Sequence, residues 1–145
     1  MTDRGIIFSA PMVQALLAGR KSQTRRLASS PLARALPGDR LWVRERFALV
    51  DGATLFRADT PTDSIRWTTP LQMPRKLSRL TLTVTGLRFE QLQEISESDA
   101  DAEGVKGGVA GYAAMWEEQH GASSWETNPK LVAVTFEVRH SNIDR

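Results

Sequence analysis

The segment KLVAVTFEVR, Lys130–Arg139, decides the fold. Its apolar residues recur at every second position from Val132 to Val138, and this period places their side chains on one face of a β-strand. The segment RLTLTVTGLRFEQL, Arg79–Leu92, alternates in the same way up to Gly86 and then changes face. A glycine at such a point is typical of a β-bulge. Two long strands are therefore expected, the first of them bulged at Gly86.

Shorter elements surround these two strands. The remaining strand patterns lie at 5–9, 24–27, 40–50 and 54–58. The expected helices run from Ser9 to Gly19, from Ser96 to Gly104 and over 108–121. The Asp-Gly pair at 51–52 predicts a hairpin, and the proline-containing stretches 29–39 and 59–75 are expected to be loops.

This order of elements indicates an α+β fold. The helices fall near the start of the chain and between its last two long strands, a distribution that argues against a doubly wound parallel sheet. We therefore expect a small, mostly antiparallel β-barrel with flanking helices. A length of 145 residues suits one domain spanning 1–145.

The composition excludes several kinds of site. Without cysteine the chain has no disulfide partner, no thiolate nucleophile and no Cys-ligated zinc, which suits the cytoplasm. No apolar run approaches the roughly 18 residues of a membrane span, so neither a membrane partner nor a secretion signal is expected. His120 and His140 lack partners at metal-ligand spacing, and no glycine-rich phosphate loop is present. We therefore expect no metal and no cofactor, while the oligomeric state stays open.

Charge is distributed unevenly, although the net charge is only +2. Residues 20–46 hold eight Arg and Lys against two acids, and residues 60–88 hold five against one. Residues 90–127 hold nine acids and one lysine. Such polarity either attracts an anionic partner such as nucleic acid or reflects solvated faces that happen to segregate.

The basic loop GRKSQTRR, 19–26, directly follows the first expected helix. Lys21 and Thr24 are three residues apart and can point into the same space. A threonine hydroxyl becomes a good nucleophile when a base takes its proton, and lysine is such a base only when neutral. Burial and the neighbouring arginines would lower the lysine pKa from about 10.4. A charged Lys21 would instead bind an oxyanion or phosphate, and a plain solvated loop is the third alternative.

Three acids, Asp99, Asp101 and Glu103, lie on the second expected helix. Acids in a first helical turn complement the helix dipole, and this accounts for Asp99 and Asp101. Glu103 precedes the glycine that ends the helix, where the dipole disfavours a negative charge. A role other than helix stabilisation is therefore expected for Glu103.

The stretch AGRKSQTRR, 18–26, resembles the GxKxxTxR signature of the ASCH domain, a small β-barrel of the PUA-like superfamily linked to RNA. Three further segments and the closing strand resemble the short ASCH proteins of phages and prophages, namely PGDRLWVRE (37–45), QMPRKLSRLTLTVTGLRFEQLQEISESDADAEG (72–104) and WEEQHGASSWETNP (116–129). The resemblance thus spans nearly the whole chain. The insertion 59–78 departs from the smallest relatives, and Lys76–Leu77 stands where a tryptophan is common, which removes one base-stacking platform.

The smallest bacterial relatives that this resemblance brings in are amidohydrolases that remove the acetyl group from N4-acetylcytidine. Their lysine, threonine and glutamate match Lys21, Thr24 and Glu103 in order. The resemblance implies that Thr24 attacks the amide, Lys21 accepts its proton and Glu103 protonates the leaving amine. Other relatives bind RNA, and ribonuclease activity is attributed to some. The expected partner is RNA or a modified cytidine nucleoside, with an RNA-binding module or ribonuclease as the alternative.

Further residues are expected to hold the substrate in a basic cleft between the loop 19–24, the strand 41–45 and the helix that ends at Glu103. Arginine offers planar, bidentate contacts to phosphate or base edges. Trp42 either faces this cleft or packs beneath the proline-rich loop, and a plain basic surface is the alternative for the arginines. The expected binding residues are Arg20, Arg25, Arg26, Trp42, Arg44, Glu45, Arg75, Ser78 and Arg79.

Overall fold

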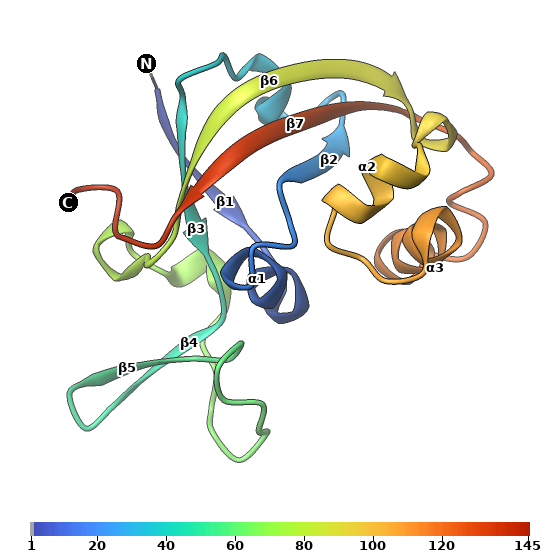
Figure 1. The fold of residues 1–145 in the computed structure, drawn as a ribbon. Coiled ribbons are helices and arrows are strands. Elements are labelled where there is room, and N and C mark those ends of the chain that lie inside the picture. The colour runs from blue at the N-terminus through green and yellow to red at the C-terminus, as the bar shows by residue number, and fades with distance from the viewer. Residues whose placement is uncertain (1) are drawn as a thin grey trace.

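The computed structural model describes residues 2–145, and its centre is a five-stranded sheet in the order β1-β3-β6-β7-β2 (Figure 1). The strands are β1 Asp3–Ile7, β2 Gln23–Leu27, β3 Arg40–Arg44, β6 Thr81–Gln91 and β7 Lys130–Arg139. The pairing of β1 with β3 is parallel, and the other three pairings of this sheet are antiparallel. The α+β class and the mostly antiparallel sheet expected from the sequence are confirmed.

The two long strands, β6 and β7, form the longest ladder of the sheet. β7 pairs with β6 along its whole length, from Lys130 to Arg139. The register shifts between Val84 and Gly86, so the bulge predicted at this glycine is confirmed. The alternating residues Val132, Val134 and Phe136 are buried in the main core, as their spacing predicts.

β1 and β2 are the outer strands of this curved sheet, and no backbone ladder joins them within residues 2–145. Instead, the Arg26 guanidinium of β2 donates from Nη2 to the Ile7 carbonyl of β1 at 2.9 Å. The expected barrel is therefore open along one line, which we call the β1–β2 seam. A side chain bridges this seam where a backbone ladder would close it.

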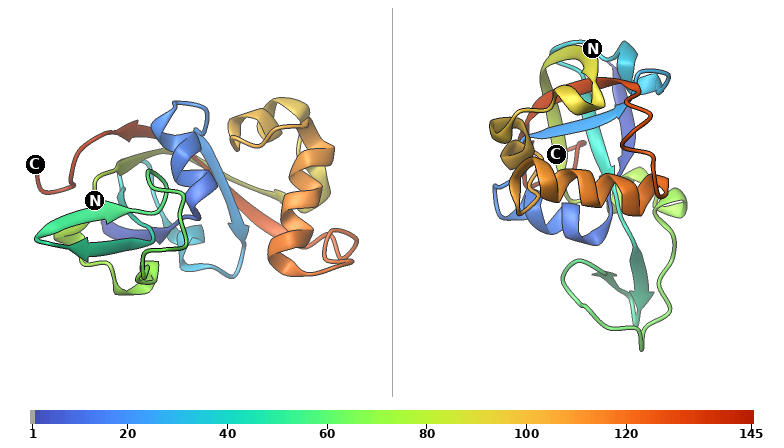
Figure 2. Two further views of the ribbon diagram at one scale, coloured as in Figure 1. Left: turned by 90° about the horizontal axis from the view of Figure 1, so that it is seen from below. Right: turned by 90° about the vertical axis from the view of Figure 1, so that its right-hand side faces the viewer.

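Strands β4 (Phe47–Val50) and β5 (Ala53–Phe56) form a separate two-stranded sheet that projects from the rest of the molecule (Figures 1 and 2). Both residues of the connecting Asp51–Gly52 turn have positive φ, and the predicted hairpin is confirmed. The single strand expected over 40–50 is wrong, because the chain leaves the five-stranded sheet at Glu45 before β4 begins. Glu45 is buried there with a partner described below.

Three α-helices flank the sheet, namely α1 Ala10–Leu17, α2 Glu97–Ala102 and α3 Gly108–His120. Ser9 and Ser96 occupy the predicted N-cap positions of the first two helices. The Ser96 hydroxyl accepts from the Asp99 amide, whereas the Ser9 side chain makes no capping hydrogen bond. Gly19 and Gly104 follow those helices with left-handed φ values of +75° and +80°. None of the helices in residues 2–145 is long and apolar enough to cross a membrane.

The helices pack at two places. α1 contributes Val13 and Leu16 to the main core of the sheet. α2 and α3 pack together over the far end of β6 and β7 (Figure 1), where Ala100, Tyr112 and Leu131 belong to a second core cluster. Short 3₁₀ turns lie within the predicted loops at Pro31–Arg34 and Pro70–Gln72, at the end of the second loop at Arg75–Leu77, and after β6 at Leu92–Glu94.

Candidate active site

A cavity of about 420 Å³ opens at the β1–β2 seam between β2 and α3. Its walls come from the end of β1, the loop after α1, β2, the end of α2 and α3. Lys21, Thr24 and Glu103, the three residues expected to be catalytic, all line it. Each of them is at most 3% exposed. The fold thus places a glutamate beside a lysine that lies 82 residues earlier in the chain.

The tight end of α1 carries Lys21 inward. Gly19 turns the chain with its positive φ, and the amides of Arg20 and Lys21 both donate to the Ala15 carbonyl. Gly104 approaches so closely that a Cβ there would lie 2.8 Å from the Ala15 Cβ and 3.1 Å from the Lys21 Cβ. Glycine at the ends of both helices therefore lets the two loops meet.

Glu103 follows the last residue of α2 and lies against Lys21. The Lys21 ammonium donates from Nζ to the Glu103 backbone carbonyl at 3.0 Å and lies 3.6 Å from the carboxylate Oε1. The other carboxylate oxygen, Oε2, is buried and has no hydrogen-bond partner within residues 2–145. Buried acceptors in folded proteins usually have a donor. Oε2 is therefore available to accept a hydrogen bond from, or give a proton to, a group in the cavity.

Burial shifts the pKa values of this pair in opposite directions. Loss of hydration is the main effect on both groups, and it lowers the pKa of Lys21 and raises the pKa of Glu103. Their mutual attraction opposes both changes, and the Arg26 charge lowers the pKa of Lys21 further. These opposite directions bring the two pKa values closer together and weaken the preference for the fully charged pair.

Thr24 lies on β2 opposite Val134 of β7. Its Oγ1 accepts a hydrogen bond from Arg26 Nε at 3.3 Å. Arg26 is itself held by the Ile7 carbonyl, and its guanidinium lies 5.1 Å from the centre of the Phe8 ring. Because the arginine uses an acceptor position of the hydroxyl, the Thr24 O–H remains free to donate to a base.

Arg25 also lines the cavity, but its side chain is fully buried among structural partners. It forms ion pairs with Glu90 and Asp99, and its Nε donates to Gln23 Oε1 at 3.1 Å. Arg88 pairs with the same two acids. Part of the charge separation seen in the sequence is thus internal pairing between a basic and an acidic segment.

Helix α3 contributes a wall that the sequence patterns did not predict. Tyr112, Trp116 and His120 recur at every fourth residue, and all three line the cavity. The rings of Trp116 and His120 stack with their centroids 3.8 Å apart and their planes 15° apart. Their spacing is visible in the sequence, but it identifies an inward face only once α3 is known to cover the seam. Burial raises the pKa of the Tyr112 hydroxyl.

The expected contribution of strand 41–45 to this cavity is wrong. None of these residues lines it, because β1 lies between β3 and the cavity. Glu45 instead accepts hydrogen bonds from Arg79, whose Nε and Nη2 lie 3.1 and 3.0 Å from its two carboxylate oxygens. Burial raises the pKa of Glu45, and the Arg79 charge opposes that rise. Glu45 and Arg79 therefore hold the chain where it leaves β3.

Two other expected binding residues, Trp42 and Arg44, lie together on the outer side of β3. The Arg44 guanidinium lies 5.0 Å from the centre of the Trp42 ring. Arg20 is exposed beyond α1, and its Nη1 donates to the Gly104 carbonyl at 3.2 Å. Neither Trp42, Arg44 nor Arg20 lines the 420 Å³ cavity.

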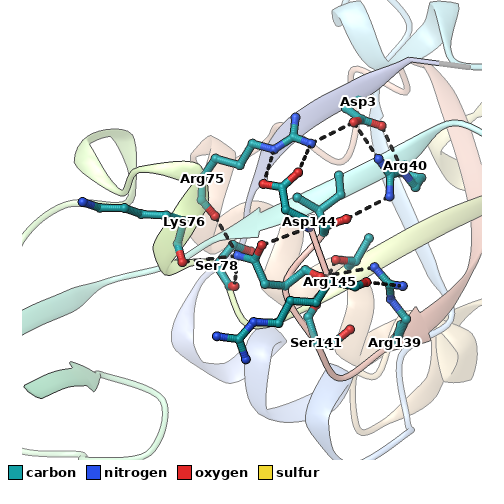
Figure 3. Close-up of polar contacts among 12 residues, drawn as sticks. Asp3, Arg40, Arg75, Lys76, Ser78, Arg139, Ser141, Asp144 and Arg145 are labelled. Carbon is teal, nitrogen blue, oxygen red and sulfur yellow. Dashed lines mark hydrogen bonds and ion pairs between the residues drawn. The ribbon is translucent and has the colours of Figure 1, made fainter.

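Arg75 and Ser78 belong to a polar cluster around the C-terminal segment (Figure 3). Arg75 pairs with Asp144 at 2.6 Å and with Asp3 at 3.0 Å. The Ser78 hydroxyl donates to the Val43 carbonyl at 2.8 Å. These residues fasten the chain end and a 3₁₀ turn to the sheet, and they lie outside the cavity.

No group of three His, Asp or Glu residues in the described chain is arranged to hold a metal ion. The three acids on α2 and at its end have different surroundings. Asp99 binds Arg25 and Arg88, Asp101 is exposed, and Glu103 lies in the cavity.

Comparison with known proteins identifies the fold. No protein-family model matches the sequence, and no curated protein matches it. Among solved structures, the hypothetical protein PH0355 matches with a TM-score of 0.59 and 15% identity over 95% of this chain and 100% of that one. Protein EF3133 from Enterococcus faecalis V583, of family-model DUF984, matches with a TM-score of 0.55 and 15% identity over 99% and 83%. An ASCH domain from Lactobacillus crispatus JV V101 matches with a TM-score of 0.56 and 16% identity over 94% and 79%, so this chain has the fold of an ASCH domain.

Proposed function

We propose that this protein hydrolyses the N4-acyl amide, specifically the acetyl amide, of a cytidine-type base presented as a nucleoside or within RNA. The observation that supports this function is the meeting of Lys21, Thr24 and Glu103 in one cavity, with the Lys21 Nζ 3.6 Å from the Glu103 Oε1. Each residue type suits one step of acyl transfer, and their order agrees with the roles that the resemblance implies.

In the proposed reaction, Thr24 Oγ1 attacks the acyl carbon while its proton passes to Lys21 Nζ. In the free protein Lys21 Nζ donates to the Glu103 carbonyl. To accept the proton, Lys21 must be the neutral amine with its lone pair toward Thr24. The negative charge of the tetrahedral intermediate develops within the field of Arg26. When the C–N bond breaks, Glu103 protonates the departing exocyclic nitrogen and becomes a carboxylate.

The resulting acyl ester of Thr24 is then cleaved by water. The Glu103 carboxylate takes a proton from the attacking water, and the Lys21 ammonium returns a proton to Thr24 Oγ1 as the ester bond breaks. Acetic acid leaves, and the neutral lysine, hydroxyl and protonated carboxyl group are restored. Every proton is thus carried by a residue of the cavity.

The shape of the cavity favours a flat base as the substrate. A volume of about 420 Å³ lies within the range of small-molecule sites. The stacked Trp116–His120 pair and the Phe8 ring offer aromatic surface against which a pyrimidine can stack. Glu103 Oε2 has no protein partner within residues 2–145 and can meet the exocyclic nitrogen of such a base.

The test is to incubate the protein with N4-acetylcytidine, and with an RNA oligonucleotide carrying one N4-acetylcytidine, and to follow deacetylation by chromatography. Lys21→Arg should be inactive, because arginine keeps the charge but cannot act as a base near neutral pH. Lys106→Arg, at an exposed position, is the matched control and should be fully active. Activity in Lys21→Arg would contradict the base role. Failure of the wild type on both substrates, with salt-sensitive RNA binding retained, would favour a binding module instead.

A further inference from the structure

A second cavity, of about 290 Å³, lies farther along the β1–β2 seam. It shares Ile7, Arg26, Ser30 and Pro31 with the first cavity. The two cavities therefore adjoin, and Arg26 faces both of them. A ligand that fills the first cavity can extend past Arg26 into the second.

Three arginines, Arg4, Arg26 and Arg44, line this second cavity. No acidic residue of the described chain lines it, and none of the three arginines forms an ion pair within residues 2–145. Other arginines, such as Arg75 and Arg79, are paired with carboxylates. The three positive charges around this cavity repel each other. A bound anion would attract all three and offset that repulsion.

Two of the three arginines have an unsatisfied donor, and one of these two is held in position. The Nε atoms of Arg4 and Arg44 are buried and have no acceptor within residues 2–145. Arg44 stacks on Trp42, and its Nη2 donates to the Leu71 carbonyl, so its guanidinium is held in one orientation. Gly5 makes room for this arrangement, because a Cβ there would lie 2.9 Å from the Arg44 Cδ and 3.1 Å from the Trp42 ring.

We propose that this second cavity, the phosphate subsite, binds a phosphate group of the nucleotide whose base enters the first cavity. Guanidinium groups match phosphate oxygens with paired, charge-assisted hydrogen bonds, and three of them suit a group with several anionic oxygens. The identity of the nucleotide rests on the proposed function, whereas the phosphate chemistry rests on the arginines alone. The substrate is then a nucleotide or an RNA chain rather than a free nucleoside.

The experiment measures binding by calorimetry with the whole protein. The ligands are cytidine, its 3′- and 5′-monophosphates, and tricytidylate. The wild type should bind the best phosphorylated ligand about tenfold or more tightly than cytidine, and Arg4→Gln and Arg44→Gln should each lose most of that preference. Both variants should keep the affinity for cytidine, since neither arginine lines the first cavity.

The matched control is Arg34→Gln. Arg34 is an exposed arginine on the neighbouring 3₁₀ turn, and it lines neither cavity. This variant should keep the full preference for phosphate. An equal loss in Arg34→Gln, an unchanged preference in the two test variants, or no preference in the wild type would overturn the phosphate subsite. Melting temperatures of all variants confirm that each is folded.

The same measurements distinguish the two sources of phosphate. Tighter binding of a monophosphate supports a subsite for free nucleotides. Tighter binding of tricytidylate, with a salt slope of log K that falls by about one in Arg4→Gln and Arg44→Gln, supports a subsite for RNA. Because no turnover is measured, failure of phosphate binding and failure of N4-acyl hydrolysis are separate results.

Discussion

Glu45 and Glu103 are two buried acids with opposite surroundings. Arg79 donates to both carboxylate oxygens of Glu45, and it is anchored in turn by Asp59 at 2.7 Å. Glu103 has Lys21 at 3.6 Å, an oxygen without a partner in residues 2–145, and a cavity in front of it. Burial raises the pKa of both acids. A raised pKa alone therefore does not distinguish the two acids, whereas an unsatisfied acceptor beside a cavity does.

The largest expected effect is on turnover at the Glu103 cavity. Thr24→Ala and Glu103→Gln should each reduce kcat for N4-acetylcytidine by about 10²–10⁴-fold, because each removes a nucleophile or proton donor. The double variant should be little worse than either single one, since the residues act as a unit. The measurement is initial rate by chromatography, and Thr127→Ala, at an exposed threonine, is the control. Multiplicative losses in the double variant would show that the residues act independently.

The Glu45 pair should respond in stability rather than in turnover. Arg79→Met leaves a buried carboxylate without its partner, which should lower the free energy of unfolding by about 3–5 kcal/mol at pH 8. The kcat per folded molecule should stay unchanged, because neither residue lines the cavity. Denaturant titration measures the first quantity, and Arg66→Met, at an exposed arginine, is the control.

The loss in Arg79→Met should also depend on pH. Without the arginine, the folded-state pKa of Glu45 rises further above its unfolded value, because the partner that lowered it is gone. A carboxyl group with a raised folded pKa binds more protons in the folded state, so stability present below the unfolded pKa is lost as pH rises through the folded pKa. The difference from wild type should therefore be small near pH 4 and full at pH 8. A difference independent of pH would contradict the assignment to Glu45.

A smaller effect is expected from pH on the wild-type rate. Lys21 must be neutral and Glu103 protonated, so the active pair holds one proton in total. Protonation of Lys21 should reduce kcat/KM on the acid side, and loss of the Glu103 proton should reduce it on the alkaline side, by about tenfold per pH unit on each limb. The lowered pKa of Lys21 and the raised pKa of Glu103 bring the two limbs closer together than in free side chains. A rate that does not fall at high pH would contradict the acid role of Glu103.

The smallest expected effect is that of chelation. Lys21, Thr24 and Glu103 provide base, nucleophile and acid, so the proposed steps need no metal. Excess EDTA should leave the deacetylation rate unchanged within error. Full loss of turnover that magnesium or manganese restores would contradict the mechanism and favour the ribonuclease-type alternative.

The regular elements were predictable because local patterns determine them. Alternation identified β7 over its observed range 130–139, and a single glycine identified the bulge at Gly86. The break at Glu45 was not predictable in this way, because its cause is an arginine 34 residues later. Local periodicity cannot predict a partner so far away in the sequence.

The same distinction between local patterns and distant contacts applies to the candidate site. Lys21 and Thr24 are three residues apart in the sequence, and Glu103 carries a negative charge at a helix end where the dipole disfavours it. The aromatic residues of α3 line the first cavity, and Arg4 lines the second, only because of how the chain packs around the β1–β2 seam. No spacing in the sequence specifies that packing. Trp42 and Arg44 alternate with the buried residues of β3, as predicted. They do not line the first cavity, because β1 lies between β3 and that cavity.

The pairing of β2 with β7 determines when, during synthesis, Thr24 can take its place in the cavity. Thr24 lies opposite Val134, and within residues 2–145 β2 takes its strand partner from β7 alone. The ribosome must therefore finish the last strand before the second strand can settle beside it. Contacts between segments so far apart in the chain form slowly. During refolding, deacetylation activity should return after the helical circular-dichroism signal. The delay between the two signals measures the time needed to complete the sheet.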